Sequence, residues 1–387
     1  MGENTKIQWA HHTFNPWRGC TKVAPGCANC YAETQSKRNP GTLGVWGPNG
    51  TRVVASEAMW RQPVKWDRVA ASLPRQIVKP GSLPIEYIDV ERLRVFCASL
   101  ADVFEDWPNR VVQSDGSVMW HRSDIGLCSA GQTTVGGVRH ERLATLDDVR
   151  ARLFGLIDST PNLDWLLLTK RPENVRRMWQ DIDRDTADMS TLLANHMRAV
   201  NARVAAGCVF NDPASEHVAY AAERDRIAHR PNVWLGTSIA CQEDADRNIP
   251  ELLNCRNLAA KLFLSIEPLV GPVDLGLDTY ESPGLYDYRK NVIDWVIVGG
   301  ESGPNARPCN IAWVRSLVEQ CDDADVPVFV KQLGANSWRT VYGGPAIVDG
   351  GIAVHSVSHE FKNKFTDPKG GDPDEWQEDL RVREVPS

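Results

Sequence analysis

The feature that most constrains this chain is a series of short apolar segments, each of which ends in polar residues. Six of them occur along the sequence, at 94–102, 164–171, 232–238, 262–267, 294–302 and 326–332. Each has a core of roughly four to six β-branched, leucine or aromatic residues, which is typical of a strand buried on both faces of a sheet. A seventh, shorter strand is predicted at 12–15.

The segments between these strands are predicted to be helices, at 143–160, 173–182, 241–255 and 311–325. Strands that alternate with helices at this spacing indicate βα units and a parallel sheet. The predicted fold is therefore an α/β partial (β/α)6-type barrel with parallel strands. A doubly wound sheet is the alternative, because hydrophobic periodicity does not distinguish the two architectures.

The domain organisation follows from where the pattern is interrupted. We expect a single α/β partial-barrel domain at 1–345, which begins with a cysteine-containing segment at 13–35. Polar stretches at about 105–145 and 198–231 are longer than usual βα connections, and we interpret them as insertions. Residues 346–387 form a polar, turn-rich C-terminal extension that packs on the barrel or trails from it.

Composition narrows the class of protein. The chain has 387 residues, with 43 basic and 50 acidic side chains and a formal charge of −7. No apolar run approaches the roughly 18–20 residues that span a bilayer, and the N-terminus has no apolar signal core. We therefore expect a cytoplasmic protein without membrane contact. The negative charge argues against a broadly basic surface but is compatible with a local basic groove.

Three of the ten cysteines lie together near the N-terminus. Cys20, Cys27 and Cys30 form a C-x6-C-x2-C pattern, and an intracellular cluster of this kind indicates a metal more than a disulfide. A helix is predicted to begin near Cys27, so that Cys27 and Cys30 share its first turn and Cys20 folds back from the preceding loop. A helix N-terminus stabilises the negative charge of thiolates.

The spacing leaves three interpretations of this segment open. A structural zinc site needs four ligands, and His11 or His12 is the candidate fourth ligand. An iron–sulfur cluster normally has four thiolate ligands, so a cluster held by three leaves one iron open to a substrate or cofactor. The third interpretation is that the cysteines bind no metal.

Polar side chains gather at the predicted C-terminal ends of the strands. In barrels and in doubly wound sheets alike, ligands bind at these ends. The polar residues there are Ser99, Asp102, Thr169, Lys170, Arg171, Thr237, Ser238, Ser265, Glu267, Glu301, Ser302, Lys331 and Gln332, with Gly299 and Gly300 directly before Glu301. We expect them to line one site.

Within this set, Lys170, Glu267 and Lys331 are the candidate catalytic residues, because acid–base chemistry uses such side chains. Gln332, Arg171 and the nearby Arg307 are candidates for binding substrate, and the two arginines suit a carboxylate or phosphate. The alternative is that the cations form ion pairs with the glutamates around the barrel mouth.

A family resemblance covers nearly the whole chain. The opening IQWAHHTFNPWRGCTKVAPGCANCYAE and the blocks LLLTKRPENV, LFLSIEPLVGPVDL and IDWVIVGGESGPNARP resemble the phage-associated three-Cys-motif family, which is held to be radical-SAM-like. The resemblance implies a [4Fe–4S] cluster on Cys20, Cys27 and Cys30, with S-adenosylmethionine on the open iron. Radical SAM enzymes typically have three residues in the first cysteine gap, whereas this chain has six.

The resemblance also implies residues for the cofactor. Tyr31 follows the last cysteine and is similar to the aromatic residue that packs near the adenine. The Gly299, Gly300 and Glu301 turn resembles the glycine-rich motif that supports the cofactor. The strand-end hydroxyl residues Ser99, Thr237 and Ser238 complete the candidate cofactor-binding set.

The predicted function is therefore a radical-SAM-like iron–sulfur enzyme that reductively cleaves S-adenosylmethionine and draws on an electron donor for its cluster. The phage association makes a nucleic-acid base or a nucleoside the expected substrate. Two alternatives come from other classes. One is a non-catalytic, zinc-stabilised module that binds nucleic acid or a partner protein. The other is a metal-independent barrel enzyme that uses Glu267, Glu301 and Lys331 for acid–base work.

Overall fold

A computed structural model gives the arrangement of most of the chain. It describes residues 5–74, 91–122, 141–186, 229–277, 293–342 and 358–386, together with short strands at 76–78, 87–89, 126–128, 134–135, 138–139, 347–348 and 351–352. The predicted insertion at 198–231 lies almost entirely outside the described residues. None of the described helices is long and apolar enough to cross a membrane.

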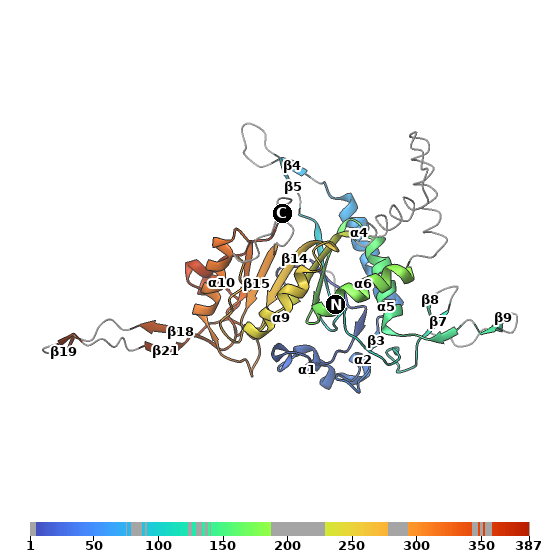
Figure 1. Cartoon of the computed structure of the whole chain (residues 1–387), viewed down its shortest axis with the longest axis horizontal. Helices are drawn as coiled ribbons and strands as arrows, with labels where there is room; N and C mark the ends of the chain where they lie inside the picture. Colours follow the sequence, from blue (N-terminus) through green and yellow to red (C-terminus); the bar gives the residue numbers. More distant parts are fainter. Residues whose placement is uncertain are drawn as a thin grey trace, which may run out of the picture.

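The centre of the molecule is a seven-stranded sheet in which every strand is parallel to its neighbours (Figure 1). In spatial order the strands are β1 (His12–Thr13), β6 (Leu93–Cys97), β12 (Leu163–Thr169), β13 (Arg230–Ser238), β14 (Ala259–Ile266), β15 (Trp295–Gly299) and β17 (Val328–Gln332). The spatial order is the order along the chain, so the sheet winds in one direction. A doubly wound sheet would reverse its order at a switch point.

The sheet curls into a half-barrel, as an aromatic cluster on its inner face shows. Trp9, which precedes β1, contacts Trp295 of β15 with ring centroids 6.2 Å apart, although four strands lie between β1 and β15. Trp234 and Phe329 also lie about 6 Å from Trp295, at 6.0 and 6.3 Å. The predicted α/β partial barrel is therefore confirmed as a curled parallel half-barrel.

Helices cover the outer face of the sheet. They are α5 (Leu146–Asp158), α6 (Pro172–Thr186), α9 (Gln242–Leu253) and α10 (Ile311–Asp323), and Figure 1 shows them arranged around the strands. In each strand, alternate residues face the two sides: Leu235 of β13 packs in the cluster with these helices, and its neighbour Trp234 packs in the inner aromatic cluster. Both faces are buried, which explains the continuously apolar strand segments.

Smaller elements flank the half-barrel. The helices α1 (Tyr31–Arg38), α2 (Pro40–Leu43), α3 (Glu57–Trp60) and α4 (Gln62–Ser72) follow β1, and β2 (Trp17–Arg18) pairs with β3 (Val53–Val54). The first predicted insertion contains β7 (Trp120–Arg122), β8 (Gly126–Cys128) and β11 (Glu141–Leu143), which form a small antiparallel sheet. The remaining short strands are β4 (Gln76–Val78), β5 (Tyr87–Asp89), β9 (Thr134–Val135), β10 (Val138–Arg139), β16 (Cys309–Asn310), β18 (Ser337–Tyr342), β19 (Ile347–Val348), β20 (Gly351–Ile352) and β21 (Ser358–Lys362).

The end of the chain lies along β17, the last strand of the sheet. Val330 N donates to Val382 O and Glu384 N donates to Val328 O, both at 2.9 Å, so these residues continue the backbone pairing in the antiparallel sense. The Trp295 indole donates to Glu384 O at 2.8 Å. The C-terminal residues thus cover the open edge of the half-barrel and close the inner aromatic cluster from that side.

His11, at the beginning of the half-barrel, should make the stability of the fold depend on pH. Burial, Arg94 and His12 lower the pKa of His11 to about 4, and its Nδ1 accepts a hydrogen bond from Arg94 N at 2.9 Å. The unfolded chain binds this proton at about pH 6.5, so folding stability should fall as the pH falls from about 6.5 to 4. We expect His11→Asn to lose less stability than the parent chain between pH 7 and pH 4.5, measured by urea unfolding. Equal losses would contradict this assignment.

Candidate functional site

The predicted site residues meet at one edge of the half-barrel. Because all seven strands are parallel, their C-terminal ends lie at the same edge. Lys170 directly follows β12, Thr237 and Ser238 end β13, Glu267 follows β14, Gly299 ends β15, and Lys331 and Gln332 end β17. Ser99 lies two residues beyond β6. The structure thus brings the strand-end candidates together.

Residues 20–31, which we call the cysteine segment, lie against this edge. A side-chain carbon added at Gly26 would lie 3.2 Å from the Ala240 side chain, 3.5 Å from Lys170 Nζ and 3.7 Å from the Pro268 ring. These three residues follow β13, β12 and β14. Figure 1 shows α1 and α2, which follow the segment, below the sheet. The cysteine segment therefore lies where α/β barrels bind their ligands.

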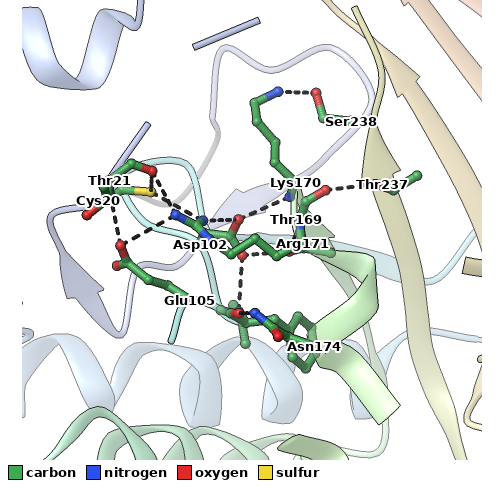
Figure 2. A network of polar contacts seen from close by, with 12 residues as sticks. Cys20, Thr21, Asp102, Glu105, Thr169, Lys170, Arg171, Asn174, Thr237 and Ser238 are labelled. Carbon is green, nitrogen blue, oxygen red and sulfur yellow. Dashed lines mark hydrogen bonds and ion pairs between the residues drawn. The ribbon is translucent and has the colours of Figure 1, made fainter. Parts of the chain in front are cut away.

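The first part of the cysteine segment is held by Arg171 (Figure 2). Its guanidinium donates to Asp102 Oδ2 at 2.8 Å and to the Thr21 carbonyl at 2.7 Å, and it lies 3.7 Å from Cys20 Sγ. Asp102 is itself fixed by hydrogen bonds from the Thr169 hydroxyl at 2.7 Å and from Lys170 N at 3.0 Å. Arg171 therefore connects the end of β12 to the first cysteine.

Burial dominates the acid–base behaviour of Cys20. It raises the pKa of the thiol to about 12, and the Glu105 and Asp102 carboxylates add to the rise, whereas Arg171 opposes it. The thiol keeps its proton in the metal-free chain and donates to Thr21 O at 3.4 Å. Burial likewise raises the pKa of Cys30. Cys20 and Cys30 are therefore neutral thiols in the metal-free chain.

The second part of the segment forms a tight turn. The 3-10 helix η1 (Pro25–Cys27) precedes α1, whose N-cap is Cys30, so the predicted helix starts at Tyr31 rather than near Cys27. Cys27 and Cys30 still share one turn, because Cys30 N donates to Cys27 O at 3.3 Å. Tyr31 anchors the start of α1 through a 2.6 Å hydrogen bond to Ser99 O.

Glu301 and Arg307 hold this turn. Arg307 forms an ion pair with Glu301 at 2.8 Å and donates to the Pro25 carbonyl at 2.9 Å. Asn29, between the two cysteines, donates to Glu301 at 3.1 Å and to Asn305 O at 2.9 Å. Although burial alone would raise it, the pKa of Glu301 is lowered by the hydrogen bonds from Arg307 and Asn29, so the carboxylate stays ionised.

Three of the four predicted cations have carboxylate partners. Arg171 pairs with Asp102 and Arg307 with Glu301, as described above. Lys331 Nζ lies 2.6 and 2.8 Å from the two oxygens of Glu267, which also accepts from Gln332 at 3.2 Å. The expected ion pairs with the glutamates of the barrel mouth are therefore present for Arg307 and Lys331, whereas Arg171 pairs with Asp102 instead. Lys170 differs: it donates to Ser238 Oγ and pairs with no carboxylate among the described residues.

The possible metal ligands that the structure describes do not converge on one point. In the described ranges, no three His, Cys, Asp or Glu side chains are placed so that they could hold a metal ion. Cys20, Cys27 and Cys30 are free and partly exposed, whereas Cys97 and Cys321 are buried. The three thiols in one segment are the donors that soft metals prefer. The donor set fits an iron–sulfur cluster, but Cys20 is turned toward Arg171.

His11 and His12, the candidate fourth zinc ligands, are engaged elsewhere. His11 accepts from Arg94 N, at the start of β6, and His12 stacks on Trp66 of α4 with ring centroids 4.3 Å apart. Neither contact lies at the C-terminal edge of the sheet. This arrangement provides no support for a Cys₃His zinc site.

Some residues that contact the cysteine segment were missed by sequence reasoning. Arg52 is fully buried and pairs with Glu105 at 2.6 Å, and Glu105 accepts from Thr21 N at 2.9 Å. Nothing in the local sequence marks this long-range pair. Asn29 had a signal, because it lies between two clustered cysteines. Asp102 was expected at a strand end, but its ion pair with Arg171 was not.

These observations define a class: an α/β half-barrel protein with a three-cysteine segment at the C-terminal edge of its parallel sheet. The chain belongs to the DUF5131 family, described as proteins of unknown function, whose family model matches residues 4–123 and 135–368. The residues between the two matched ranges lie in the first insertion. Neither the curated proteins nor the solved structures that were compared gave a match.

Proposed function

We propose that this chain is a radical-SAM-like iron–sulfur enzyme of the three-Cys-motif type, which reductively cleaves S-adenosylmethionine to begin radical chemistry on its substrate. One observation carries the proposal: the cysteine segment lies at the C-terminal edge of a parallel half-barrel. There Gly26 lies beside residues that follow β12, β13 and β14, with too little room for a larger side chain next to Ala240. An iron–sulfur cluster held by three thiolates leaves one iron open for a cofactor.

The residues present suit the two groups that the proposal requires. Cys20, Cys27 and Cys30 would hold the cluster. When bound, the cluster and S-adenosylmethionine would supply a 5′-deoxyadenosyl radical that abstracts hydrogen. Cys20 must lose its proton to become a ligand, and the Arg171 guanidinium, 3.7 Å from its sulfur, provides a positive charge beside the thiolate.

Neighbouring groups could hold the cofactor. Tyr31 is anchored by its hydroxyl but remains 54% exposed, which leaves its ring face available for stacking. Gly299 ends β15 and has no side chain, so a ligand could approach the backbone there. At Gly300 the close neighbour is the chain itself, because a side-chain carbon would lie 2.4 Å from Leu333 O. Ser99, Thr237 and Ser238 complete the proposed set at the same edge. Glu301, the other residue expected in this set, already accepts hydrogen bonds from Arg307 and Asn29.

Lys170 is the side chain that bears most on the substrate. Its ammonium has a hydroxyl partner but no carboxylate partner among the described residues, so it can bind an anionic group. A phosphate of a nucleotide or nucleic acid is the anion that we propose. Arg171, Arg307, Lys331 and Glu267 are less available, because each is already in an ion pair.

Anaerobic reconstitution tests the proposed function. We expect the parent chain to bind about four irons and four sulfides, as a [4Fe–4S] cluster requires. S-adenosylmethionine should perturb the spectrum of the reduced cluster, and dithionite should release 5′-deoxyadenosine slowly. Stoichiometric zinc without any capacity for sulfide would instead favour the zinc-stabilised module and would end the radical proposal.

A further inference from the structure

We propose that two arginine–carboxylate pairs are positioning residues that hold the cysteine segment against the sheet, one at each end. We call Arg307 with Glu301 the first clasp and Arg171 with Asp102 the second clasp. In each clasp the carboxylate follows a strand and orients a guanidinium, and the guanidinium reaches across to the cysteine segment. The inference deepens the proposed function. It rests on that function only for the identity of the metal that the cysteines bind.

The first clasp fixes the turn that carries Cys27 and Cys30. Glu301 Oε2 accepts from Arg307 N at 2.8 Å and from Arg307 Nε at 2.9 Å, and Oε1 accepts from Arg307 at 2.8 Å. These bonds leave one guanidinium nitrogen free to reach the Pro25 carbonyl at 2.9 Å. Pro25 begins the 3-10 helix that ends at Cys27. The turn is thereby tied to β15.

The hydrogen bonds that the Glu301 carboxylate already accepts support a positioning role. Its side chain is only 7% exposed, and Oε2 accepts three hydrogen bonds once Asn29 is included. A carboxylate that bound a cofactor ammonium would have to exchange some of these bonds for the ligand. Charge-assisted hydrogen bonds are among the stronger ones in proteins, so the internal partners compete well.

The second clasp fixes the start of the segment. Thr169 and Lys170 N hold Asp102, and Asp102 holds Arg171 through a 2.8 Å bond. The other guanidinium nitrogen donates to the Thr21 carbonyl at 2.7 Å. Both members of this pair are buried, with side chains 8% and 7% exposed. Replacing Arg171 therefore leaves the buried Asp102 carboxylate without this ion-pair partner and removes the hydrogen bond to the Thr21 carbonyl.

Hydrogen exchange of the metal-free chain tests both clasps without any cofactor. We expect Arg307→Ala to speed amide exchange at residues 27–30 by about tenfold, because a charge-assisted hydrogen bond is lost, and to leave residues 19–21 unchanged. Arg171→Ala should show the reverse pattern. Arg307→Lys, which cannot span both Glu301 and Pro25, is the gentler variant should the alanine variant fail to fold.

Arg92→Ala is the matched control. Arg92 also pairs with a largely buried carboxylate, Asp164, at 2.7 Å and donates to the Pro161 carbonyl at 2.6 Å, but it lies at the opposite edge of the sheet. Its loss should not change exchange anywhere in residues 19–30. Unchanged exchange in both clasp variants would overturn the proposal, even if the chain binds no iron at all.

Reconstituted protein separates positioning from cofactor binding. Glu301→Gln should lower the iron retained after a chelator challenge, whereas the ratio of bound S-adenosylmethionine to iron should stay that of the parent chain. Arg307→Lys should show the same pattern to a smaller degree. A Glu301→Gln protein that keeps its iron but binds S-adenosylmethionine more weakly would overturn the first clasp and make Glu301 a cofactor ligand.

Discussion

Replacing Cys20, Cys27 or Cys30 by alanine is expected to reduce the iron bound after anaerobic reconstitution from about four per chain to almost none. Each thiolate would hold one iron of the cluster. No other cysteine lies in the cysteine segment, so no nearby thiolate can take the place of the one that is removed. Iron and acid-labile sulfide assays measure the loss.

Cys321→Ala provides the comparison for this experiment. Cys321 is fully buried on α10, in the cluster between the helices and the sheet, so its loss affects packing but not the site. We expect this variant to bind as much iron as the parent chain. Full iron content in the Cys20→Ala protein would show that the metal does not depend on the three-cysteine pattern.

Trp295→Ala is expected to destabilise the fold by about 3–5 kcal/mol, the range for truncating a large buried aromatic residue. Trp295 is completely buried and lies at the centre of the inner aromatic cluster, where it contacts Trp9, Trp234 and Phe329. Its indole also donates to Glu384 O. Urea unfolding at neutral pH measures the change in the free energy of unfolding.

The matched substitution is Trp313→Ala on α10. Trp313 is only partly buried and packs against the outer cluster, so its removal leaves a smaller cavity and should cost less than half as much. Similar losses for the two variants would mean that the inner aromatic cluster does not hold the half-barrel together.

The strands were predictable because their signal is local. Each predicted segment contains a strand of the central sheet, and the tryptophans of three of these strands, Trp165, Trp234 and Trp295, are buried. The local sequence could not decide between a barrel and a doubly wound sheet, because that depends on which strands become neighbours. Trp9 and Trp295 are far apart in sequence, and only their contact shows that the sheet curls.

The location of the site was predictable from the sequence, but the pairing of its charged side chains was not. Parallel strands end at one edge, so Lys170, Glu267 and Glu301 were expected to gather there. Which cation meets which carboxylate depends on side-chain reach and loop path, and Arg171 pairs with Asp102 and Glu105 rather than with Glu267 or Glu301. The start of α1 was also misplaced: Pro25 and Gly26 close a 3-10 turn before the helix begins.

The backbone pairing of residues 382–384 with β17 has a practical consequence for producing this protein. A half-barrel, unlike a closed barrel, has a last strand whose amide and carbonyl groups can recruit a strand from another molecule. Here residues 382–384 pair with Val330 N and Val328 O of that strand. A purification tag fused directly after these residues would disturb the backbone pairing with β17, and a truncation that removes residues 382–384 would abolish it. Either change would favour association between molecules through β17, so tags belong at the other terminus or behind a flexible spacer.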